Sequence, residues 1–217
     1  MLVVRYEAIV LVFLACRAAF AQNTIADWFP LHVGDKWTYA HESRDDTGRG
    51  SAGAEIHRWT TEESIAGSWT IPEGVLIEKQ VRITEGDQHA GSRVDLSSAY
   101  LLRGDCLYTT WVDWQPRDHT LKPEYRDALL AGHVVPDLCF PLAANNTWGA
   151  KDWQVKGQPD NQGIYHVASI SSYPGSGETV DIWFQKGTGI YREEDIHHGT
   201  IGELRTWLVR FEPAAQR

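Results

Sequence analysis

Apolar and polar residues alternate with a period of two over long stretches of this 217-residue chain. The stretch 75–84 places β-branched residues on one face and charged or amide side chains on the other, and 179–185 alternates in the same way. The stretch 204–211 also alternates, with apolar residues on both faces. Alternation of this kind is typical of half-buried β-strands and excludes a mainly helical fold.

Turn-forming groups rich in Gly, Pro and Asp separate these stretches, and two of them, Arg103-Gly104-Asp105 and 186–189, predict hairpin turns. Shorter strand candidates lie at 37–41, 55–61, 99–102, 106–111, 148–155 and 165–170. One short helix is expected at 123–131, where Pro stands near the start and Gly132 follows the end. We therefore predict one mainly β domain over residues 22–217, an antiparallel curved sheet or partly closed barrel of about nine to eleven strands.

One short cassette occurs twice. Residues 29–37 and 140–148 both read Phe-Pro-Leu, five further residues, then Trp. Because Pro lacks an amide donor and biases the preceding residue towards extended geometry, each cassette should be a strand entry. Its Phe, Leu and Trp are expected to be core anchors. The repeat also suggests two halves dividing near residue 140.

Residues 1–21 have the pattern of an export signal. Ala8–Ala15 is apolar and Ala19-Phe20-Ala21 offers small residues at the cleavage positions. The apolar run is too short to span a bilayer, so no transmembrane segment is expected. We predict a secreted or periplasmic bacterial chain beginning at Gln22. The alternative is a lipoprotein anchored through an acylated Cys16, although Phe13-Leu14-Ala15-Cys16 is a poor lipobox.

Removal of the signal leaves two cysteines, Cys106 and Cys139. An even pair in an exported chain predicts a disulfide bond. Closing a loop of about 33 residues would contribute roughly 3 kcal/mol under the loop-entropy model.

Charge and motifs exclude several functions. Without Arg5, Arg17 and Glu7 the chain carries 18 basic and 28 acidic residues, which disfavours binding to nucleic acid or to anionic lipid. There is no Gly-x-Ser-x-Gly elbow, Walker loop or dinucleotide fingerprint, and no cofactor is expected. Whether the chain is an enzyme stays open, because the carboxyl pair of a glycosidase is defined in space and not in sequence.

Ten tryptophans stand out, and their main expected role is packing between strands. The best candidate ligand site is Trp111, Asp113 and Trp114 at the end of a strand, where an Asp beside two rings could hold a sugar. The acids and imidazoles of 193–198 suggest a metal, but neighbours on a strand point to opposite faces. We therefore interpret 193–198 as a solvated hairpin end and predict no metal site.

The opening Trp28-Phe29-Pro30-Leu31-x-x-Gly34-x-x-Trp37-x-Tyr39 resembles the start of a broad group of uncharacterised exported bacterial proteins and lipoproteins. The closing Gly187-Thr188-Gly189 hairpin, within 183–194, is similar to that group's C-terminal end. The resemblance implies an extracytoplasmic, mainly β domain and no particular reaction.

The leading hypothesis is an exported cell-envelope or secreted β domain that binds an apolar, glycan or protein ligand. The alternatives are an extracytoplasmic hydrolase acting on glycans and a structural or adhesive surface module. A membrane tether is expected only if Cys16 is acylated.

Overall fold

The computed structural model describes residues 24–46, 55–86, 95–112, 136, 138–149, 153–169, 178–197 and 201–215. The expected export signal with Cys16, the expected helix at 123–131, and Asp113 and Trp114 lie outside the described residues. Within the described part of the chain, no helix has the length and apolar character needed to cross a membrane.

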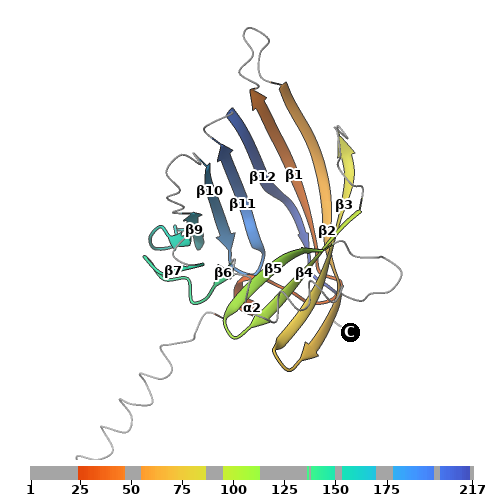
Figure 1. Ribbon diagram of the computed structural model, residues 1–217, viewed down its shortest axis with the longest axis vertical. Coiled ribbons are helices and arrows are strands. Elements are labelled where there is room, and N and C mark those ends of the chain that lie inside the picture. The colour runs from red at the N-terminus through yellow and green to blue at the C-terminus, as the bar shows by residue number, and fades with distance from the viewer. Residues whose placement is uncertain are drawn as a thin grey trace, which may run out of the picture.

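The described residues form one antiparallel sheet of twelve strands (Figure 1). Its order is β6-β5-β4-β3-β2-β1-β12-β11-β10-β9-β8-β7. The strands are β1 (Lys36–Asp46), β2 (Glu55–Ile71), β3 (Gly74–Gly86), β4 (Asp95–Arg103), β5 (Cys106–Val112), β6 (Leu138–Cys139), β7 (Thr147–Trp148), β8 (Trp153–Val155), β9 (Ile164–Ser169), β10 (Glu178–Gln185), β11 (Gly189–His197) and β12 (Ile201–Glu212).

The chain builds this sheet as two meanders. Strands β1 to β6 run outwards to one edge, and β7 to β12 start at the other edge and return, so that β12 pairs with β1 at the centre. The change from one edge to the other takes place over residues 140–146. Residues near the middle of the sheet are therefore supplied by both ends of the chain.

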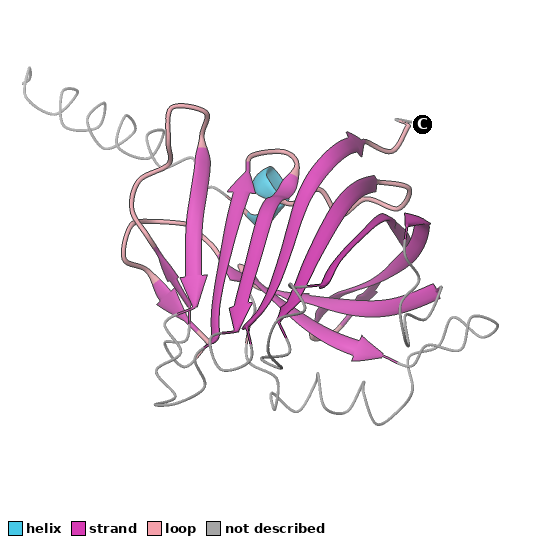
Figure 2. Ribbon diagram, turned by 90° about the horizontal axis from the view of Figure 1, so that it is seen from above, coloured by secondary structure: helices cyan, strands magenta, loops and turns pink. Residues whose placement is uncertain are grey.

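The sheet is strongly curved, and its two edges approach each other (Figure 2). Residues 140–146, which join edge strands β6 and β7, can span at most about 25 Å when fully extended. The edges also meet near Gly149, where an added Cβ would lie 3.3 Å from the carbonyl oxygen of Pro136. The predicted mainly β, antiparallel and curved architecture is confirmed.

The expected strand number of nine to eleven is too low. The stretch 148–155 is two strands and not one, because Gly149, at φ +61°, lies in the turn that separates β7 from β8. Strand β6 has only two residues, too few for a periodic signal. Residues 193–197, expected as a hairpin end, belong to strand β11, which carries charged side chains on both faces.

A helix that the sequence did not predict, α2 (Ile25–Trp28), lies inside the curve at one end of the sheet (Figure 2). Its N-cap is Thr24, whose backbone N–H donates to the Asp27 carboxylate at 2.9 Å. The Trp28 ring packs edge-on against Tyr165 of β9, with centroids 5.0 Å apart. Helix α2 thus fills the apolar end of the concave face.

Both cassettes are strand entries, as predicted. Trp37 and Trp148 are the second residues of β1 and β7, and their exposed fractions are 2% and 7%. The indole N–H of Trp37 donates to the carbonyl of Thr188 at 2.6 Å. Gly34 adopts φ +98° in the turn before β1, and the buried Asp35 carboxylate accepts the backbone N–H of Ala214 at 2.8 Å. The first cassette therefore binds β1 to the C-terminal segment.

The disulfide between Cys106 and Cys139 is present. The two residues are direct cross-strand partners of β5 and β6. The bond therefore fastens the very short strand β6 to one edge of the sheet.

Candidate functional site

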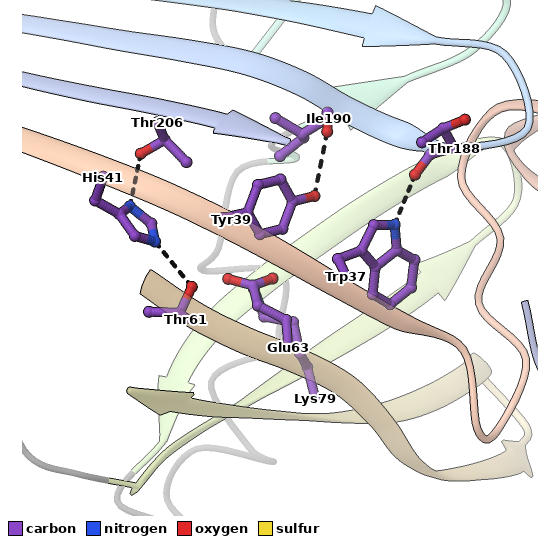
Figure 3. A network of polar contacts seen from close by, with 9 residues as sticks. All are labelled: Trp37, Tyr39, His41, Thr61, Glu63, Lys79, Thr188, Ile190 and Thr206. Carbon is purple, nitrogen blue, oxygen red and sulfur yellow. Dashed lines mark hydrogen bonds and ion pairs between the residues drawn. The ribbon is translucent and has the colours of Figure 1, made fainter. Parts of the chain in front are cut away.

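A group of polar side chains occupies the concave face just beyond the apolar core (Figure 3). We call it the concave polar cluster and define it as Tyr39 and His41 of β1, Thr61 and Glu63 of β2, Lys79 of β3, Tyr100 of β4, Glu193 of β11 and Thr206 of β12. These strands are neighbours in the sheet, and they come from both meanders. The cluster therefore exists only in the complete fold.

His41 bridges two strands with both ring nitrogens. Its Nδ1 lies 3.0 Å from Thr206 Oγ1, and its Nε2 lies 2.8 Å from Thr61 Oγ1. The pKa of His41 is lowered from 6.5 to about 4, mainly by burial; the nearby Glu63 opposes this shift and Lys79 adds to it. The ring is therefore neutral at neutral pH, donating one hydrogen bond and accepting the other.

The indole of Trp59 stacks on His41, with ring centroids 5.0 Å apart and planes 9° apart. Trp59 and His41 are direct cross-strand partners, so the stack covers one side of the imidazole. This stack fixes the ring orientation that the two threonine contacts require.

Lys79 and Glu63 form an ion pair, with Nζ 2.8 Å from Oε2 and side-chain exposures of 14% and 19%. The Lys79 ammonium also lies 5.4 Å from the centroid of the Tyr100 ring. Burial alone would lower the pKa of Lys79, but Glu63 and Tyr100 outweigh burial and hold it well above its usual value. Lys79 therefore stays charged in a nearly dry site.

Glu193 lies on the same concave face, on strand β11, at the end of the cluster farthest along the sheet from β3 and β4. It is the direct cross-strand partner of Thr206, which contacts His41. Burial raises the pKa of Glu193, Lys79 acts against this effect, and Glu63 adds to it. Among the described residues Glu193 makes no hydrogen bond or ion pair. It is a carboxyl group held among other charges without a donor of its own.

Tyr39 joins the cluster to the core. Its hydroxyl donates to the carbonyl oxygen of Ile190 at 3.2 Å. Burial and then the nearby Glu63 raise the pKa of Tyr39 well above 10, so the phenol keeps its proton. The apolar side chains of Trp37, Ile65 and Ile77 lie next along the same strands. The concave face thus changes from apolar to polar within a few residues.

A second feature is a groove of about 810 Å³ at the end of the sheet near α2. It lies between the loop 30–35, the β10–β11 turn at Gly187, and the C-terminal residues Phe211 and 213–215. Its walls are mainly apolar, and Val33 is 53% exposed.

The convex face carries a self-contained ladder. His166 stacks on Trp183 with centroids 4.7 Å apart, and the guanidinium of Arg192 lies 4.8 Å from the Trp183 ring. His166 Nε2 also meets Asp181 Oδ1 at 2.6 Å. The rings and charges of this ladder are therefore engaged with one another.

The ligand-binding prediction at Trp111, Asp113 and Trp114 is untested, because only the backbone of Trp111 is described. That backbone pairs with Ser98, and Ser98 pairs with Lys79. Trp111 and Lys79 therefore occupy one cross-strand row. In the described residues there is no group of three or more His, Cys, Asp or Glu that could hold a metal ion.

The sequence contained a signal for the concave polar cluster that composition alone did not reveal. Lys79 has the same parity in β3 as the apolar residues 75, 77, 81 and 83, so it is the one charged side chain on the apolar face of that stretch. Its partner Glu63 alternates in the same way with Thr61 and Ile65. Glu193 gave no comparable signal, since β11 has charges on both faces.

No protein-family model and no curated protein matches this sequence. Among solved structures, an exported protein with a YmcC-like fold from Bacteroides fragilis matches at TM-score 0.42 and 8% identity, over 85% of this chain and 98% of its own. A lipoprotein from Parabacteroides distasonis matches at TM-score 0.43 and 13% identity, over 85% and 97%. A LolA superfamily protein from Nitrosomonas europaea matches at TM-score 0.25 and 11% identity, over 90% and 92%. These likenesses are too distant to assign a family or an activity to this chain.

Proposed function

We propose that this chain is an extracytoplasmic β domain that binds a small molecule at the concave face of its sheet. In this proposal the polar part of the ligand lies at the concave polar cluster, beside His41, Glu63, Lys79 and Glu193, and the neighbouring apolar side chains hold the rest of the ligand. The observation that carries the proposal is the burial of charged groups on a face that the fold could fill with apolar residues.

Removing the charges of Lys79 and Glu63 from water costs free energy, and this cost calls for an explanation. Replacing a buried ion pair by packed apolar residues is often neutral or stabilising, so stability alone does not explain why Lys79 and Glu63 are buried as a pair. Buried titratable groups with shifted pKa values gather at functional sites more than elsewhere. The residual exposures of 14% for Lys79 and 19% for Glu63 leave both within reach of a ligand.

An extracytoplasmic location is supported by the cross-strand disulfide, since such bonds persist in oxidising compartments. It agrees with the export signal expected at residues 1–21 and with the resemblance of the N-terminal cassette to exported proteins. Acylation of Cys16 is the alternative form of the same proposal. Palmitate labelling of the wild type and of Cys16→Ala distinguishes the two, because only an acylated Cys16 gives a difference.

The proposal is tested with a panel of decylammonium, decanoate, decyl maltoside and chitotriose, using calorimetry on the wild type. At least one probe is expected to bind, and the double variant Glu63→Met/Lys79→Met should lose at least tenfold in affinity. The control is Lys36→Met/Glu62→Met, which removes a more exposed pair, with Lys36 46% and Glu62 38% exposed, and should bind normally. Equal binding by all three proteins, or no binding of any probe, would contradict the proposal.

A glycan hydrolase is the second candidate, because Glu63 and Glu193 both face the concave side. Hydrolysis needs one carboxyl group that keeps its proton and a second one that is charged. The raised pKa of Glu193 suits the first role, but the ion pair with Lys79 occupies Glu63. Release of reducing ends from chitotriose, abolished in Glu193→Gln, would establish this activity; no release from the wild type would exclude it for this substrate.

A further inference from the structure

The concave polar cluster has an imbalance in hydrogen bonding that indicates the chemistry of its ligand. Lys79 is its only basic side chain, and it is already engaged by Glu63 at 2.8 Å and by the Tyr100 ring. His41 is neutral and uses both nitrogens on threonine hydroxyls. The donors of the cluster are thus largely consumed within it.

The hydrogen-bond acceptors of the cluster are not all engaged within it. Glu193 is largely buried and has no hydrogen-bond or ion-pair partner among the described residues, and Glu63 is engaged through Oε2. The basic residues Arg192 and Arg205 are adjacent on the sheet but lie on the opposite face, where they meet Glu194. They cannot serve Glu193, because neighbouring residues of a strand point to opposite faces.

An apolar side chain lies directly beside this acceptor. Ile182 of β10 is the direct cross-strand partner of Glu193 and packs against the core. A ligand that reaches Glu193 therefore also meets apolar surface.

We propose that the ligand of the concave face is an amphipathic amine, whose ammonium group docks between Glu193 and Glu63 and whose apolar part lies along Ile182. This inference rests on the function proposed above and specifies its ligand class. An ammonium supplies up to three donors and one positive charge, whereas the one positive charge of this site, Lys79, is already paired with Glu63. An anion would instead meet two carboxyl groups with the only cation already paired. The raised pKa of Glu193 agrees with a carboxyl group whose charged form has no directly paired cation.

The test compares probes of equal chain length, decylammonium and decanoate, below their micelle concentrations at pH 7.5. Calorimetry on the wild type should show decylammonium binding at least tenfold more tightly. Glu193→Gln should reduce the affinity for decylammonium about tenfold and leave that for decanoate unchanged or higher. The matched control is Glu194→Gln, which removes the same charge one residue away on the convex face and should alter neither affinity.

Three outcomes would overturn the amine assignment. The first is equal or tighter binding of decanoate, and the second is no binding of decylammonium. The third is an equal loss in Glu193→Gln and Glu194→Gln, which would indicate attraction to an acidic protein in general. The proposed function is contradicted by a different result, namely that no probe of the panel binds in a way that depends on Glu63 and Lys79. Tight binding of decanoate that depends on these two residues would support the proposed function and reject the amine as the ligand class.

Discussion

Lys79 Nζ and Glu63 Oε2 lie 2.8 Å apart on the concave face of the sheet, with most of both side chains removed from water. Removing one partner should be costly, because the other charge stays buried. We expect Lys79→Met to lower the free energy of unfolding by about 3–5 kcal/mol. Urea denaturation at pH 7 measures this loss.

The same relationship predicts a rescue. Adding Glu63→Met to Lys79→Met should recover most of the lost stability, since packed apolar residues often replace a buried pair without loss. Lys36→Met is the control, because its pair with Glu62 is more exposed and contributes about 0–1 kcal/mol. A double variant as unstable as the single one would show that the pair itself stabilises the fold.

His41 should make stability depend on pH. Its pKa is about 4 in the folded protein and 6.5 as the ordinary value, so the unfolded chain takes up a proton first on acidification. The stabilising contribution is complete above pH 6.5 and is lost as pH falls towards 4, amounting to about 3 kcal/mol. The measurement is urea denaturation of wild type and His41→Gln at several pH values. The difference between them should shrink with acidification; a constant difference would refute the assignment.

The first cassette should be a major source of stability. Trp37 is 2% exposed and donates a hydrogen bond to Thr188, so Trp37→Ala should cost about 3–5 kcal/mol. Trp37→Phe keeps much of the packing but removes the donor, and its cost should be clearly smaller. Trp207, at 40% exposure, is the control, and Trp207→Ala should cost less than half as much in thermal or urea unfolding.

The disulfide predicts a response to reducing agent. Joining Cys106 to Cys139, 33 residues apart, should contribute about 3–4 kcal/mol by restricting the unfolded chain. Dithiothreitol should therefore lower the urea midpoint of the wild type towards that of Cys106→Ser/Cys139→Ser, and should leave the double variant unchanged. A wild-type midpoint that does not respond to complete reduction would contradict this.

Much of the sheet could be predicted from sequence because its strands carry an apolar face. Strand β3 alternates clearly and was expected over nearly its full length. Strand β11 could not be recognised in the same way, since Glu193 serves the concave face and Glu194 pairs with arginines on the convex face. Local sequence patterns do not show which neighbouring strand will supply the group that compensates a buried charge.

The candidate site depended still more on long-range pairing. Tyr39 and His41 have the same parity as Trp37 in β1, so the sequence could place them on its inner face. Their partners Thr61 and Thr206 lie on strands from opposite ends of the chain, and only the closure of β12 onto β1 brings them together. The sequence-based choice of Trp111, Asp113 and Trp114 remains a separate prediction.

The central claim is that a ligand binds the concave face at the concave polar cluster. Amide chemical shifts of the ¹⁵N-labelled wild type, followed during titration with the panel probe that binds most tightly, test this most directly. The proposal predicts shifts concentrated at Tyr39, His41, Glu63, Lys79 and Glu193. Shifts confined to the groove beside residues 30–35 and 213–215, or to the convex ladder around Trp183, would contradict it.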